Sequence, residues 1–166
     1  IIGVPKEIKP QENRIGLTPE SVKTLVSEGH KVLVENNGGF EAGFDNDQYT
    51  NSGAKIANNA ADIFNDAEII VKVKEPQKVE VDMIRENQII YTYLHLAAAK
   101  ELTEGLIKSK SINIAYETVT DDNGRLPLLA PMSAVAGRMS VQAGAHCLEK
   151  NQKGRGLLLG GAPGVS

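Results

Sequence analysis

Short apolar runs alternate along most of the chain with segments in which apolar residues recur at helical spacing. The apolar runs are rich in Ile and Val and have the length of strands. We therefore expect buried, mostly parallel strands. The predicted strands cover residues 1–4, 31–35, 68–73, 88–94 and 111–116.

The segments between these strands carry helix signals. Thr18 is placed to cap a helix whose first residue is Pro19, and Gly29 is placed to end it. Alternating strands and helices predict an α/β fold, a Rossmann-like parallel sheet with flanking helices and right-handed crossovers. Further helices are expected over residues 45–53, 59–64, 97–109 and 133–150.

The pattern changes after Tyr116. A turn cluster at 121–124 precedes Pro127 and Pro131, which exclude a regular helix between them, and the helix predicted over 133–150 is rich in small residues. Residues 154–164 predict a short strand entering a glycine-rich loop, but their spacing does not match the Gly-x-Gly-x-x-Gly fingerprint. We expect residues 1–130 to form a substrate-binding domain. Residues 131–166 would be an interdomain helix and the start of a truncated dinucleotide-binding domain, so the chain would be a fragment of a longer protein.

Composition and charge exclude several classes of function. The formal net charge is −3, and acids and bases are interspersed, which argues against nucleic acid or a membrane surface as partner. No apolar run reaches the roughly 18 residues of a membrane span, and the start lacks the features of a signal peptide. Cys147 is the single cysteine, which fits a reducing compartment, so the expected location is the cytoplasm. No cluster of His, Cys or carboxylate residues has the spacing of metal ligands.

Three ionisable side chains fall where predicted strands end. Arg14 follows the first strand, Lys74 the third and His95 the fourth. Ligands bind at the carboxyl edge of an open parallel sheet, so we expect the three to share one crevice. A guanidinium matches a carboxylate, an ammonium can bond a carbonyl oxygen, and an imidazole transfers protons near neutrality. This set suits a small carboxylate whose neighbouring carbon exchanges protons.

Each of these residues also has a structural interpretation. Arg14 could be a solvated loop arginine, and His95 could be structural. Lys72 and Lys74 would point to the same face unless the chain bends before Pro76, and they could be lysines that protect an edge strand. Lys74 is the better functional candidate because it lies nearer the strand's carboxyl end.

Six motifs together resemble the N-terminal part of bacterial alanine dehydrogenases. That resemblance implies NAD-dependent interconversion of L-alanine with pyruvate and ammonium by a homohexamer. It implies that Arg14 and Lys74 bind the substrate, that His95 is the acid/base, and that Ser133 contacts the cofactor. The family also uses an aspartate and a fingerprint loop outside these residues, so this chain alone is expected to be inactive. The motifs lie at residues 2–7, 14–19, 72–76, 93–97, 115–118 and 127–133.

Two other functions stay open. The NAD(H)-binding subunit of proton-translocating nicotinamide nucleotide transhydrogenase shares the Arg-x-x-x-Thr-Pro start at residues 14–19, although the segments at 74–76 and 94–96 argue against it. A non-catalytic module that binds a small acid is the other alternative. Hydride transfer to pyruvate by the full-length parent would separate these possibilities.

Overall fold

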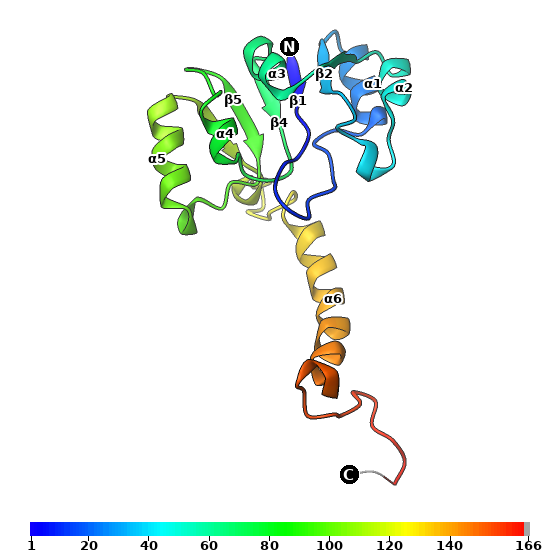
Figure 1. Cartoon of the computed structure of the whole chain (residues 1–166). Helices are drawn as coiled ribbons and strands as arrows, with labels where there is room; N and C mark the ends of the chain where they lie inside the picture. Colours follow the sequence, from blue (N-terminus) through cyan, green and yellow to red (C-terminus); the bar gives the residue numbers. More distant parts are fainter. Residues whose placement is uncertain (165–166) are drawn as a thin grey trace. The chain divides into compact units, whose positions relative to one another are not determined.

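The N-terminal unit is built on a six-stranded parallel sheet (Figure 1). The computed structural model describes residues 1–164. The strands lie in the order β3-β2-β1-β4-β5-β6, and all five neighbouring pairs are parallel. The predicted Rossmann-like sheet is thereby confirmed. The strands are β1 (Ile2–Val4), β2 (Val32–Glu35), β3 (Lys55–Ala57), β4 (Ile69–Val71), β5 (Ile89–Thr92) and β6 (Ile112–Ala115).

The sequence did not predict β3, and it extended two other strands too far. β3 is a three-residue edge strand that begins with an exposed lysine, so it has little apolar signal. β4 ends at Val71 and β5 at Thr92, two residues before the predicted ends. Consequently Lys72, Lys74 and His95 all lie in loops beyond the carboxyl edge of the sheet.

Most helices form where the sequence predicted them. The Thr18 hydroxyl accepts the Ser21 N–H at 3.3 Å, and Pro19 is the first residue of α1. Asp45 and Gln48 form a reciprocal capping box at the start of the next helix. The helices are α1 (Pro19–Ser27), α2 (Asn46–Asn51), α3 (Ala60–Asp66), α4 (Lys78–Val81), α5 (Lys100–Ser109) and α6 (Ala130–Leu148), with 3₁₀ turns η1 (Phe40–Ala42), η2 (Leu96–Ala98), η3 (Tyr116–Thr118) and η4 (Lys150–Gln152).

Other helices differ from the prediction in presence, division or start. α4 was not predicted, because four residues are too few to show a helical period. The helix expected over 97–109 is divided at Ala99 into η2 and α5. α6 begins at Ala130, since Pro131 falls in its first turn, where a missing N–H breaks no helical hydrogen bond.

Helices cover both faces of the sheet, and each face has its own apolar cluster. Ile2 and Val4 pack with Val22 of α1 and Tyr49 of α2. Gly3, which points the other way, lies against Ile63 and Ala67, and a Cβ there would come within 2.5 Å of the Ile63 side chain. α3 thus packs closely on β1, and Ile63, Phe64 and Ile70 join Leu106 of α5 in the second cluster. The sheet is therefore a doubly wound one.

A second unit begins at Thr120 and contains α6 and η4. The strand predicted at the start of 154–164 does not form: Leu157, Leu158 and Leu159 are exposed, and Ala162 is an isolated bridge residue. A strand needs a neighbouring strand to pair its backbone N–H and C=O groups, and the apolar run at 157–159 has none in the described structure. The strand prediction for this segment was therefore wrong. None of the described helices is long and apolar enough to cross a membrane.

Candidate functional site

Three loops leave the sheet at one edge. They follow β1, β4 and β5, which are neighbours in the sheet, and Arg14, Lys74 and His95 lie one in each. β1 is also the strand from which the sheet grows in two directions, first to β2 and then to β4. Such a switch point, at the carboxyl ends of the strands, is where doubly wound sheets bind ligands.

Lys72 is a structural residue. Its side chain is fully buried, and its Nζ lies 3.1 Å from Glu7 Oε2 and 2.7 Å from Glu80 Oε1. β4 lies inside the sheet, so the interpretation of these lysines as protection for an edge strand is wrong. Lys74 is only half-buried, and its loop has left the strand.

The buried carboxylate of Glu7 holds the backbone at Lys74. Its Oε1 accepts the N–H of Val73 at 2.6 Å and of Lys74 at 3.2 Å, while its Oε2 binds Lys72. Glu80 is the second carboxylate that pairs with Lys72, and burial raises its pKa. The sequence did not single out Glu7. Its structural role depends on hydrogen bonds to residues more than 60 positions away in the sequence, which no local pattern indicates.

Arg14 is held by Glu12. Its Nε and Nη2 donate to the two carboxylate oxygens at 2.8 and 2.6 Å, and its backbone N–H donates to Oε1 at 3.0 Å. The hydrogen bond from Arg14 lowers the pKa of Glu12 to about 2, and the positive charge of Lys74 contributes. Glu12 therefore forms an ion pair with Arg14, and the charge of Lys74 also influences its carboxylate.

Gly16 fixes the Arg14 loop against β4. A Cβ at this position would lie 2.5 Å from the carbonyl oxygen of Val71 and 3.2 Å from the backbone nitrogen of Lys72. The loop after β1 can approach the end of β4 this closely because residue 16 has no side chain.

We expect Gly16→Ala to destabilise the protein by about 1–3 kcal/mol, because the methyl group would collide with backbone atoms that cannot rotate away. Chemical unfolding of the parent and the variant measures this. Gly137→Ala is the control: in the interior of α6 a Cβ meets nothing within 4 Å, and stability should be unchanged or higher. Equal stability of Gly16→Ala and the parent would contradict the close approach.

His95 sits in an unusual backbone conformation. Its φ and ψ are 51° and 38°, in the left-handed region. The backbone N–H of His95 donates to Glu117 Oε1 at 2.6 Å, and that of Leu94 donates to the same oxygen at 3.1 Å. The exposed imidazole stacks on Tyr93, with the ring centres 6.0 Å apart and the planes 12° from parallel.

Tyr93 stacks on His95 and also influences the pKa of Arg14. The hydrogen bond to Glu12 is the main cause of the raised pKa of Arg14, and the nearby Tyr93 also contributes. Tyr93 packs edge-on against Tyr116, with ring centres 5.0 Å apart, and burial raises the pKa of Tyr116. Tyr93 therefore contacts both the ring of His95 and that of Tyr116.

Glu75 lies within electrostatic reach of His95. Burial opposes its ionisation, but an ion pair with Lys9 and the charge of His95 keep its pKa below the usual range. Direct contacts join the loops after β1, β4 and β5: Lys9 pairs with Glu75, and the backbone N–H of Tyr93 donates to the carbonyl of Val73 at 3.4 Å. Glu7, Glu12 and Glu117 are the members of this arrangement that the sequence did not identify.

Ser133 belongs to the second unit, where it is exposed on the first turn of α6. Its backbone N–H donates to the Leu129 carbonyl at 3.0 Å, as in a regular helix. Across residues 1–164, no group of three or more His, Cys, Asp or Glu side chains is placed to hold a metal ion.

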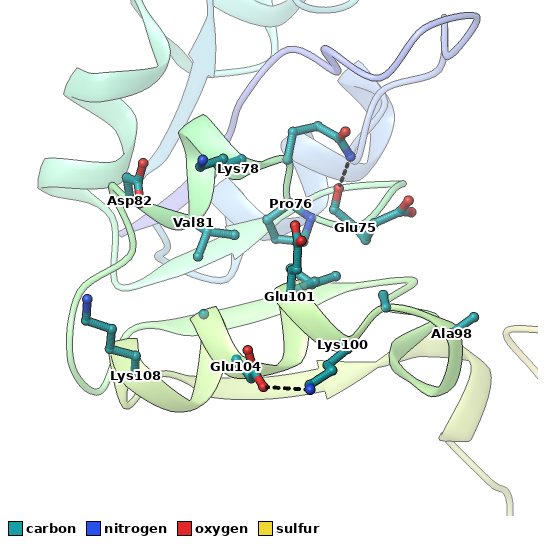
Figure 2. Close-up of a pocket in the computed structure, with 14 residues that line it drawn as sticks. Glu75, Pro76, Lys78, Val81, Asp82, Ala98, Lys100, Glu101, Glu104 and Lys108 are labelled. Atoms are coloured by element: carbon teal, nitrogen blue, oxygen red, sulfur yellow. Dashed lines mark hydrogen bonds and ion pairs between the residues drawn. The ribbon is translucent and has the colours of Figure 1, made fainter.

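A separate groove of about 650 Å³ runs between α4 and the η2–α5 segment (Figure 2). The side chain of Val81 in α4 faces Gly105 of α5, where a Cβ would lie 2.7 Å from it. Acidic and basic side chains both line it, and none of Arg14, Lys74 and His95 does. The groove therefore contains none of the three predicted residues, although Glu75 lines it.

The doubly wound parallel sheet defines a Rossmann-like domain, and cations paired with carboxylates lie at its carboxyl edge. Residues 3–136 match the family model described as alanine dehydrogenase/PNT, N-terminal domain. The chain belongs to this family.

Relatives and solved structures with similar sequences agree with this assignment. The chain is 53% identical to an alanine dehydrogenase of Halomonas elongata over 165 residues, which is 99% of this chain and 44% of that protein. It is 53% identical to an alanine dehydrogenase of Bacillus subtilis, covering 100% of this chain and 43% of that protein. A solved structure of an L-alanine dehydrogenase superposes with a TM-score of 0.87 at 55% identity, covering 99% of this chain and 45% of the other.

A more distant structure also matches. The transhydrogenase from Sinorhizobium meliloti has a TM-score of 0.69 at 26% identity, covering 74% of this chain and 35% of the other. The chain spans less than half the length of the curated relatives it matches.

Proposed function

We propose that this chain is the substrate-binding part of an NAD-dependent alanine dehydrogenase, which interconverts L-alanine with pyruvate and ammonium. One observation carries the proposal: Arg14, Lys74 and His95 come from three neighbouring loops at one edge of the sheet. The backbone N–H of each residue donates a hydrogen bond to a glutamate carboxylate. The identity of about half to the curated alanine dehydrogenases supports the choice of substrate.

Arg14 and Lys74 suit the two polar groups of a 2-oxo acid, its carboxylate and its carbonyl. A guanidinium has five N–H donors in a planar fork, so Arg14 can bind a carboxylate while it keeps Glu12. The Lys74 ammonium can donate to the carbonyl oxygen and polarise the carbon that ammonia attacks. Because Glu12 neutralises part of this charge, a small monocarboxylate fits the site better than a dianion.

His95 is assigned the proton transfers. Oxidation of the amine leaves an iminium, and water must lose a proton as it adds to that carbon. The same proton is then needed on nitrogen, so that ammonia leaves as the carbonyl forms. A single imidazole serves both steps, because it accepts and returns a proton near neutral pH. The exposed imidazole of His95 is accessible to water and substrate.

NAD, when bound, supplies the hydride acceptor for the α-carbon. Ser133 is the residue of this chain that we assign to it, since the hydroxyl is exposed at the start of α6. We assign residues 1–130 to substrate binding and residues 131–166 to the link with the nucleotide-binding part. We also propose that the full-length protein is a cytoplasmic homohexamer, with the exposed Cys147 in a reducing compartment.

An NAD(H)-binding transhydrogenase subunit is the second candidate, because the same family model and one solved structure include that class. It needs no site for a 2-oxo acid, so carboxylate-held Arg14 and Lys74 argue against it.

The test is NADH oxidation by the full-length protein, followed by absorbance. We expect oxidation that requires pyruvate and ammonium together, with L-alanine as product. Hydride transfer to an oxidised NADP analogue without pyruvate would instead identify a transhydrogenase. Pyruvate binding without NADH oxidation would identify a binding module.

A further inference from the structure

Carboxylates hold the backbone at all three proposed substrate-contacting residues. Glu12 accepts the N–H of Arg14 at 3.0 Å, Glu7 that of Lys74 at 3.2 Å, and Glu117 that of His95 at 2.6 Å. The bond at His95 is the shortest of these three. Of the three residues, His95 alone has a backbone in the left-handed region.

Sheet register brings Glu117 to this place. β5 and β6 are parallel neighbours in which Thr92 lies opposite Ala115. Glu117 is in η3, two residues past Ala115, while Leu94 and His95 are two and three residues past Thr92. The Glu117 side chain therefore reaches across from the next strand's loop to both N–H groups.

His95 needs such support. A residue other than glycine in the left-handed region costs free energy and persists only where its surroundings determine the conformation. The carbonyl of His95 accepts the Ala98 N–H at a long 3.4 Å, and its ring stacks on Tyr93. The bonds from Leu94 and His95 to an anionic acceptor are the strongest polar contacts that the structure gives this turn.

We propose that Glu117 is a positioning residue, which fixes the imidazole of His95 by accepting the backbone N–H groups of Leu94 and His95. This inference rests on the proposed function, in which His95 transfers protons. Glu117 itself is assigned no contact with substrate. To fill this role, residue 117 needs an oxygen acceptor within reach of both N–H groups.

The kinetic test compares Glu117→Ala with Glu117→Gln in the full-length protein. Alanine removes the acceptor, and misplacement of the imidazole should lower kcat for pyruvate reduction by about 10²-fold with little change in KM. Glutamine keeps an amide oxygen for both N–H groups and should retain most of kcat. Two results would overturn the proposal: an unchanged kcat in Glu117→Ala, or an equal loss in both variants.

Hydrogen exchange at the amides of Leu94 and His95 is the second readout, and it does not depend on activity. We expect exchange to become about tenfold faster, or more, in Glu117→Ala but not in Glu117→Gln. Unchanged exchange in Glu117→Ala would refute the hydrogen bonds themselves. If the parent does not reduce pyruvate, the proposed function fails, and exchange alone then decides whether Glu117 holds this turn.

Asp45→Ala is a matched control. Asp45 Oδ1 accepts the Gln48 N–H at 2.8 Å at the start of α2, so the variant also removes a carboxylate from a backbone N–H. It should lower the stability of the protein, because it removes an N-cap. Exchange at Leu94 and His95 and kcat should both stay at the parent values. A matching loss of kcat in this control would attribute the Glu117 effect to general destabilisation and overturn the positioning role.

Discussion

His95→Ala in the full-length protein should lower kcat for pyruvate reduction by about 10²–10⁴-fold, the usual contribution of a general acid/base. Pyruvate binding should change far less, because Arg14 and Lys74 are assigned the contacts with its carboxylate and carbonyl. Steady-state kinetics with varied pyruvate gives both quantities. The exposed side chain of His95 contributes little to the core, so the variant should fold.

Two further variants make the His95 result specific. His95→Asn removes the acid/base but tolerates the left-handed conformation at φ 51° better than alanine, so it should show the same loss with less backbone change. His30→Ala, at an exposed position after α1, should behave as the parent. A His95→Asn enzyme with parental kcat would exclude His95 from the proton transfers.

Arg14→Ala should weaken pyruvate binding by about 10–150-fold, as expected when a charge-assisted hydrogen bond is lost. Arg14→Lys should restore little of the affinity, because an ammonium lacks the planar fork. The pKa of Glu12 is about 2, so the pair of Arg14 and Glu12 stays ionised at neutral pH and the effect should vary little there. Calorimetric titration of the full-length protein with pyruvate measures the affinity.

The loss of Arg14 also leaves Glu12 without its partner, and an unpaired carboxylate would itself repel pyruvate. A double variant with Arg14→Ala and Glu12→Ala separates the two effects: if Arg14 binds the substrate, the double variant stays weak. Lys23→Ala, which removes an exposed cation from α1, is the control and should bind as the parent. Parental affinity in Arg14→Ala would refute the carboxylate assignment.

The sheet and its site loops could be predicted because the relevant signals are local. Apolar runs identify five of the six strands, and the capping of α1 by Thr18 with Pro19 in first position is visible in the sequence. Once the strands are parallel, Arg14, Lys74 and His95 must emerge at one edge. The short edge strand β3 escaped prediction because three half-exposed residues carry almost no periodic signal.

The supporting carboxylates could not be predicted in the same way. Glu7 lies 65 residues from Lys72 in the sequence, and Glu117 lies 22 residues from His95. Nothing in the local pattern distinguishes these acids from solvated ones. The sequence favoured Lys74 over Lys72 from its place near the strand's carboxyl end, but the buried ion pairs of Lys72 with Glu7 and Glu80 could not be predicted. Long-range hydrogen bonds, rather than residue type, determine these roles.

The pairing of cations with carboxylates also affects how the crevice attracts a ligand. Arg14, Lys72 and Lys74 lie close to Glu7, Glu12 and Glu80, so opposite charges nearly cancel a short distance away. The long-range electrostatic attraction on a small anion would therefore be weak, and hydrogen-bond donors would bind it only at contact distance. Its rate of association should therefore depend only weakly on ionic strength.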